Sequence, residues 1–116
     1  MRLEPGIADA VLRAASARPG TPFNVNHADA DGRDLAVGLR DLLVRAGWSQ
    51  LSAVSPAPGF PRRGLILWAP PGEIALVEML AAALRERFPV EVIERTDGGP
   101  VALTVGLATW ASARGL

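Results

Sequence analysis

The stretch 24–34, NVNHADADGRD, holds the only histidine of the chain together with three aspartates. Imidazole and carboxylate groups are common ligands of divalent metals and common groups in acid–base catalysis. An EF-hand calcium loop needs glycine at its sixth position and glutamate at its twelfth. Counted from Asp29, those positions hold Asp34 and Arg40, so the EF-hand is excluded. His27 and the aspartates would otherwise serve a metal-dependent hydrolase, which is one alternative for the function.

A structural interpretation accounts for the same acids without a ligand. Asp31 can cap the helix expected after it, and Asp34 lies three residues on, at the second position of a capping box. Acids in a first turn also complement the helix dipole. The sequence has no second histidine, and no serine in a nucleophile elbow. We therefore expect a strand end followed by a helix start, with no metal, cofactor or catalytic residue, in a protein that is not an enzyme.

Apolar spacing along the chain predicts three helices and five strands. Phe23 and Val25 alternate with asparagines as in a half-buried strand, whereas 65–68 is a continuous apolar run typical of a central strand. The expected helices cover residues 3–20, 32–46 and 70–87. The expected strands cover residues 21–26, 50–54, 64–69, 90–94 and 101–109, with a proline-rich loop over 55–63.

This order, α-βαβ-βαβ-β, predicts the fold class and the domain division. A doubly wound sheet would need a crossover helix between the second and third strands, where the sequence has a loop. We expect an α+β fold, a two-layer split βαβ sandwich of ferredoxin-like type, with strands 21–26 and 64–69 adjacent in its centre. Residues 1–20 are an N-terminal helix or linker, residues 21–110 the single α+β domain, and residues 111–116 a tail.

In that topology both strand-to-helix loops leave the same end of the sheet. Two helix starts there would present free N–H groups and positive partial charge, which favour an anion. Neither loop has the glycine spacing of a P-loop or of a dinucleotide-binding turn. The candidate ligand-binding residues are Asn26, His27, Asp29, Asp31, Pro70, Gly72 and Glu73. They support a second hypothesis, a sensor domain for a small anionic metabolite or a nucleotide.

The second long helix is apolar nearly all round. Between residues 74 and 84 every residue except Glu78 is apolar, although a helix on one sheet needs only one apolar stripe. Leu76, Leu80 and Ala83 are therefore left to meet something besides the sheet. Either the N-terminal helix covers them, or they form the interface with a protein partner or a second copy of the chain.

The bulk composition restricts the partners. Twelve basic and twelve acidic residues give a net charge of zero, so we expect no nucleic-acid partner. The chain has no cysteine, which leaves the redox compartment open. The longest apolar stretch, 74–84, is about half of a bilayer span. We expect no membrane span here and a soluble domain, either cytoplasmic or attached to a membrane-anchored parent protein.

The run 35–48, LAVGLRDLLVRAGW, resembles the "LA…L…L..AG-aromatic" helix of the LytR C-terminal domain family, small modules attached to bacterial cell-envelope proteins. Asn26 at a strand end, Gly32 before the helix, and the closing strand 101–106 with its final glycine are similar to features of that family. The similarity spans residues 23–108. The chain is also similar to the soluble domain of uncharacterised bacterial membrane-anchored proteins. Both resemblances imply a non-catalytic accessory or interaction module that acts beside another domain, through protein–protein contact.

Overall fold

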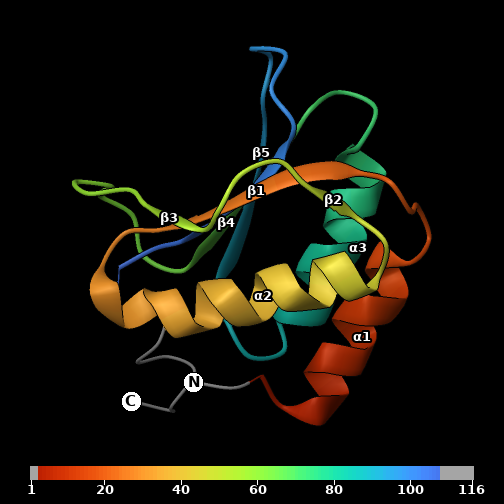
Figure 1. Cartoon of the computed structure of the whole chain (residues 1–116), viewed down its shortest axis with the longest axis horizontal. Coiled ribbons are helices and arrows are strands. Elements are labelled where there is room, and N and C mark those ends of the chain that lie inside the picture. Colours follow the sequence, from red (N-terminus) through yellow and green to blue (C-terminus); the bar gives the residue numbers. More distant parts are fainter. Residues whose placement is uncertain (1–2, 108–116) are drawn as a thin grey trace.

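Three α-helices and a mixed sheet make up the part of the chain that the computed structural model describes, residues 3–107 (Figure 1). The helices are α1 (Pro5–Ala15), α2 (Arg33–Arg45) and α3 (Ile74–Leu84), with a 3₁₀ turn, η1, at Ala30–Gly32. The strands are β1 (Pro22–His27), β2 (Ser49–Gln50), β3 (Ser55–Pro56), β4 (Leu65–Ala69), β5 (Val90–Glu94) and β6 (Val101–Val105). The α+β class expected from the sequence is confirmed.

The last strand, β6, lies in the middle of the sheet. The order is β2-β1-β6-β4-β5, and β3 also pairs with β1. β6 runs parallel to β1 and antiparallel to β4. All five residues of β6 are buried, as expected of a strand with a neighbour on each side in the middle of a sheet. The predicted adjacency of strands 21–26 and 64–69 is therefore wrong, because β6 separates them.

Each βαβ half keeps its own strands side by side. β1 pairs in parallel with both β2 and β3, and β4 pairs in parallel with β5 over five residues. A split βαβ unit needs a gap between its two strands, and this direct pairing leaves none. β6 is accommodated between the two halves instead, so the sheet does not have the ferredoxin-like order. The strand expected over 50–54 is reduced to β2, and β3 falls inside the expected loop.

All three α-helices pack on one face of the sheet. Alternate strand residues, such as Val25, Leu67 and Leu103, join the helices in one apolar core. Ile66 and Ala102 are also buried but lie outside that core, because successive side chains of a strand point to opposite faces. Within residues 3–107 the second face is therefore free of helices and is bordered by the proline-rich loop.

The N-terminal helix α1 belongs to the main core. Ile7 and Ala15 are buried, and α1 packs against both α2 and α3 (Figure 1). The indole N–H of Trp48 donates to the carbonyl of Ala15 over 2.8 Å, and the Trp48 ring meets Phe23 edge to face with centroids 5.8 Å apart. The sequence predicts an appendage or linker in residues 1–20, but an apolar stripe on α1 makes this helix part of the domain.

The second apolar side of α3 is covered by α1. Leu76 and Leu80 are buried, Leu80 with 1% of its surface exposed, and Ala83 is half-buried. The prediction of an interface through Leu76 and Leu80 is therefore corrected, since both side chains lie inside the fold of their own chain. The large apolar side chain of α3 that reaches solvent is Met79, at 50% exposure.

The end of β6 crosses the start of β4 with no space for a side chain. The N–H of Gly106 donates to the carbonyl of Gly64 over 2.7 Å. A Cβ atom on Gly106 would lie 2.5 Å from the carbonyl oxygen of Arg62. The expected strand over 101–109 thus ends at Val105, followed by a single bridge between Arg63 and Leu107. Residues 108–109 of the expected strand and the expected tail, 111–116, lie outside the described residues.

Candidate functional site

The two loops expected to form one site lie at opposite ends of the sheet. β1 ends at His27, which is opposite Val105 at the end of β6. β4 runs the other way along β6, so its end lies near the start of both β6 and β1. Asn26, His27, Asp29 and Asp31 are therefore separated from Pro70, Gly72 and Glu73. The prediction of a shared site is wrong because it depended on β1 and β4 being parallel neighbours.

The loop after β1 is a structural turn. His27 is only 4% exposed, and its Nδ1 lies 2.8 Å from the backbone oxygen of Asp29. A carbonyl can only accept, so Nδ1 carries the hydrogen and donates it. The Asp29 carboxylate accepts from the N–H of Gly32 over 2.9 Å and caps η1. The predicted cap, Asp31, is exposed, because the extra 3₁₀ turn moves the capping position two residues upstream.

Metal binding by this loop finds no support in its geometry. Across residues 3–107, no three histidine, cysteine, aspartate or glutamate side chains come together as a set of metal ligands. Gly32 is instead a packing position, because a Cβ atom there would lie 2.9 Å from Cγ1 of Val105. The start of α2 thus lies against the end of β6.

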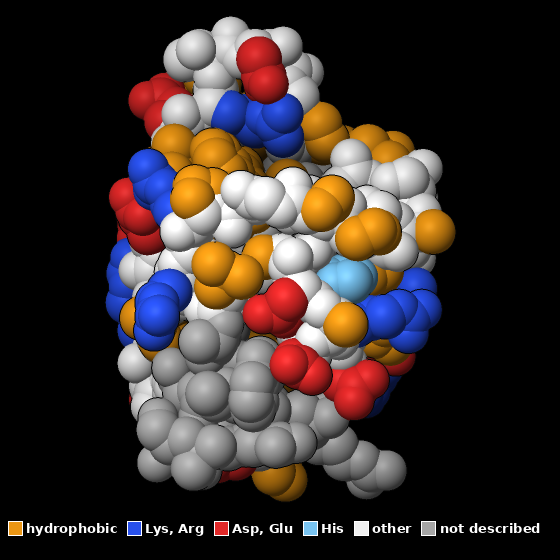
Figure 2. Space-filling model, turned by 90° about the vertical axis from the view of Figure 1, so that its left-hand side faces the viewer, with side chains coloured by type: hydrophobic (Ala, Val, Ile, Leu, Met, Phe, Trp, Pro, Cys, Tyr) orange, Lys and Arg blue, Asp and Glu red, His pale blue; other side chains and the backbone are white. Residues whose placement is uncertain are grey.

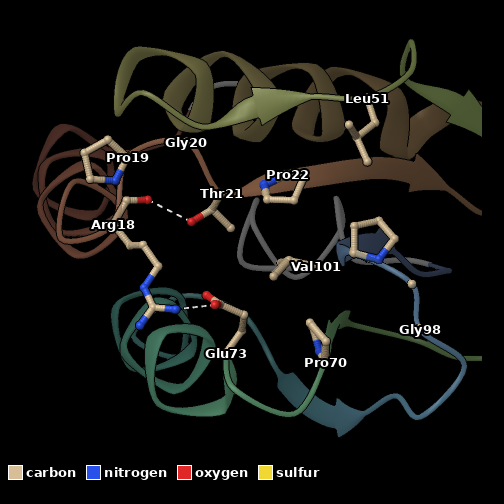
Figure 3. A pocket seen from close by; sticks show the side chains of 12 residues that line it. Arg18, Pro19, Gly20, Thr21, Pro22, Leu51, Pro70, Glu73, Gly98 and Val101 are labelled. Atoms are coloured by element: carbon tan, nitrogen blue, oxygen red, sulfur yellow. Dashed lines mark hydrogen bonds and ion pairs between the residues drawn. The ribbon is translucent and has the colours of Figure 1, made fainter.

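A pocket of about 570 Å³ opens at the other end of the sheet, beside the start of α3 (Figure 3). We call it the Glu73 pocket. Its walls are residues 18–22, 51, 70, 73 and 98–101. Pro22, Pro70 and Val101 point into the pocket, and Leu51 lies at its edge (Figure 3). Two of the predicted ligand-binding residues, Pro70 and Glu73, line it, whereas Gly72 turns to solvent with a positive φ of 83°.

Glu73 and Arg18 supply the charged groups of this pocket. Glu73 holds the position just before α3, and its N–H donates to the carbonyl of Pro70 over 3.0 Å. One carboxylate oxygen, Oε1, pairs with the guanidinium of Arg18, which reaches across from the end of α1 (Figure 3). The other, Oε2, is buried and has no hydrogen-bond partner. The Glu73 side chain is 21% exposed and that of Arg18 is 55% exposed.

A second hollow, of about 440 Å³, lies on the helix-free face of the sheet. We call it the Asn26 groove. Its floor consists of Asn26, Trp68, Ala102 and Thr104, and its walls are residues 57, 60 and 94–97. The side-chain oxygen of Asn26 is buried without a partner, and the indole N–H of Trp68 donates to Oγ1 of Thr104 over 3.1 Å.

The Arg95 side chain is folded into the turn between β5 and β6. It bonds both carboxylate oxygens of Asp97 at 2.8 Å and the carbonyl of Pro100 at 2.8 Å. The two bonds from Arg95 to the Asp97 carboxylate, with one from the N–H of Gly99, hold the pKa of Asp97 well below its usual range. The charge of Arg95 is thus balanced inside the turn, which stands between the two hollows.

Patterns in the sequence identified only some of the residues that line these two hollows. Arg18 lies in the expected linker, and no local signal separates it from the other arginines. Thr104 is the one polar residue of an otherwise apolar strand, whereas Asn26 lies on the polar side of an alternating strand and shares that pattern with Asn24. On the face shown in Figure 2, acidic side chains gather beside the histidine, and basic side chains lie to either side of them.

Helix length and the comparisons with known proteins complete the description. None of the helices within residues 3–107 has the length and apolar character needed to cross a bilayer. No protein-family model matches the chain, and comparisons with curated proteins and with solved structures give no significant match. The resemblance to the LytR C-terminal domain family therefore stays a prediction.

Proposed function

We propose that this chain is a non-catalytic accessory module that acts beside another domain and binds a small apolar amine in the Glu73 pocket. The observation that supports this proposal is the buried carboxylate oxygen Oε2 of Glu73, which has no partner. Buried polar atoms are almost always hydrogen-bonded, and an unpaired one calls for an explanation. An ammonium group placed against Oε2 would supply the missing donor, and a hydrogen bond to a charged group contributes about 1.5–3 kcal/mol.

The shape of the pocket fits the rest of such a ligand. Its volume, about 570 Å³, is within the usual range of small-molecule sites. Proline, leucine and valine side chains provide apolar walls, and Glu73 faces a single basic group, Arg18. An anion would meet the Glu73 carboxylate, so this pocket favours a cation over the anionic metabolite expected from the sequence. His27 is buried and bonded to the backbone, which supports a role in folding rather than in catalysis.

Binding of three cyclohexyl compounds tests the proposal. Cyclohexylamine should raise the melting temperature, whereas cyclohexanecarboxylate should not, and cyclohexanol should act weakly. At one hundred times Kd the amine would stabilise the fold by about 2.7 kcal/mol. For a domain of this size that corresponds to roughly 10 °C. Equal shifts with the amine and the carboxylate, or no shift with the amine, would disprove the proposal.

Three variants assign the effect to the pocket. Glu73→Gln should abolish the response to the amine, and Glu86→Gln, which changes an exposed acid outside the pocket, should not. Arg18→Gln breaks the ion pair but leaves the carboxylate in place, so it should retain or tighten amine binding. If Glu73→Gln responds like Glu86→Gln, the carboxylate of Glu73 is not the binding group.

A further inference from the structure

We infer that the Asn26 groove is a second binding site, for an uncharged planar ligand whose edge carries a hydrogen-bond donor beside an acceptor. This inference is independent of the Glu73 pocket. The groove lies on the helix-free face, and the two hollows share no lining residue. Carboxamides, lactams and nucleobases all present such an edge.

The amide of Asn26 sets the donor–acceptor requirement. Its Oδ1 is buried and unpartnered, so a ligand N–H there would satisfy a group that the free protein leaves unpaired. A carboxamide presents a carbonyl acceptor next to an NH₂ donor. A ligand edge of the same kind can pair with both groups at once, as asparagine does when it contacts an adenine edge.

Thr104 and Trp68 extend the polar site across the sheet. Thr104 lies directly opposite Asn26 in the parallel register, so the two side chains stand next to each other on one face. The Trp68 indole donates to Oγ1 of Thr104, and this bond leaves the hydroxyl hydrogen of Thr104 available for a ligand acceptor. The sheet therefore offers a ligand an acceptor and a donor on the Asn26 amide, and a second donor on Thr104.

The walls of the groove favour a flat ligand that carries no negative charge. Trp68 and Phe60 are half-buried and both line the groove, which gives aromatic surface for a planar ring. The guanidinium of Arg95 is engaged by Asp97, so it does not supply an open cation for an acidic ligand. A volume of about 440 Å³ is enough for one or two fused rings.

Titration of the full chain with nicotinamide, followed by NMR, tests the inference. Nicotinamide carries a carboxamide on a flat ring, and N,N-dimethylnicotinamide is the matched probe without N–H donors. We expect saturable shifts of the Trp68 indole N–H and the Asn26 side-chain amide with nicotinamide. The dimethyl probe should bind at least about threefold more weakly, because it cannot donate to Oδ1.

Two asparagine variants separate binding from folding. Asn26→Leu should weaken nicotinamide binding at least about threefold yet leave the free protein as stable as before, since the lost oxygen had no partner. Asn24→Leu is the control, because Asn24 lies on the same strand and face, bonds Ser52 and stays outside the groove. Phe60→Ala, in the loop wall, should weaken binding without involving the strand.

Three results would overturn the inference. The first is the absence of shifts at Trp68 and Asn26 with nicotinamide at millimolar concentration. The second is equal affinity for the two probes. The third is a large loss of stability in Asn26→Leu, which would show that the amide oxygen already has a structural role, for instance through a bridging water.

Discussion

Replacing Leu80 by alanine tests whether α3 is covered by its own chain. Leu80 is 1% exposed, and the sequence predicts it on the side of α3 that does not meet the sheet. Besides the sheet, α1 is the element that packs on α3. Removing the leucine side chain therefore leaves a cavity in the core that α1, α3 and the sheet share.

The expected loss of stability is large. Leu→Ala substitutions in a packed core cost about 2–5 kcal/mol, through lost burial and the cavity that remains. For a domain of this size, that corresponds to a fall in melting temperature of about 8–20 °C. Met79→Ala is the matched control on the same helix, since Met79 is 50% exposed. It should change the free energy of unfolding by less than about 0.5 kcal/mol.

Urea unfolding of both variants, at two protein concentrations tenfold apart, gives the measurement. If Leu80 is buried within its own chain, the midpoints will not depend on concentration, and only Leu80→Ala will lose stability. A homodimer through Leu80 would instead show midpoints that rise with concentration, by mass action. Either that dependence, or a Leu80→Ala variant as stable as Met79→Ala, would refute the placement of α1 on α3.

Three further predictions concern the core, the strand crossing and the acid range. Trp48→Phe leaves the buried carbonyl of Ala15 without its donor and should cost about 1–3 kcal/mol, measured by urea unfolding. Gly106→Ala forces a Cβ atom to within 2.5 Å of a backbone oxygen and should prevent stable folding. Gly6→Ala, in open space on α1, should instead stabilise the protein by about 0.5–1 kcal/mol. Thermal melting measures both effects. The pKa of Asp97 is lowered by its arginine and glycine partners, so their stabilisation is present above the ordinary aspartate pKa, about 3.9, and is lost as the pH falls below it. A carboxyl NMR titration that places the Asp97 midpoint at or above that ordinary value would contradict this assignment.

Local patterns predicted the elements better than their arrangement. The spacing of Leu35, Leu39 and Leu43 and the alternation in β1 depend on neighbours along the chain, and both elements are present as expected. Strand order depends on which apolar strand is covered on both faces. Two stretches, 65–68 and 101–105, are almost equally apolar, and alternation alone does not show which of them lies at the centre.

The error in strand order carried over to the candidate site. Because β6 separates β1 from β4, the loops that follow these two strands lie at opposite ends of the sheet. The residues of the predicted anion site are therefore split between the two ends. Glu73 nevertheless lines one hollow together with Arg18, and Asn26 lines the other together with Phe60. No local sequence motif identifies Arg18 or Phe60. Such hollows form between segments far apart in sequence, so a linear pattern can identify one wall but not the facing wall.

The central strand β6 is the last strand in the sequence, so the sheet can be completed only near the end of synthesis. β1 is complete at His27, yet its inner neighbour begins only at Val101, so both βαβ halves emerge from the ribosome with an open inner edge. At typical elongation rates of about 5–20 residues per second, the edge of β1 waits roughly 4–15 s for its partner and the edge of β4 roughly 2–6 s. Unpaired strand edges are templates for aggregation. The nascent chain is therefore most vulnerable just before its last strand appears, and a message truncated there would yield two halves without the strand that joins them.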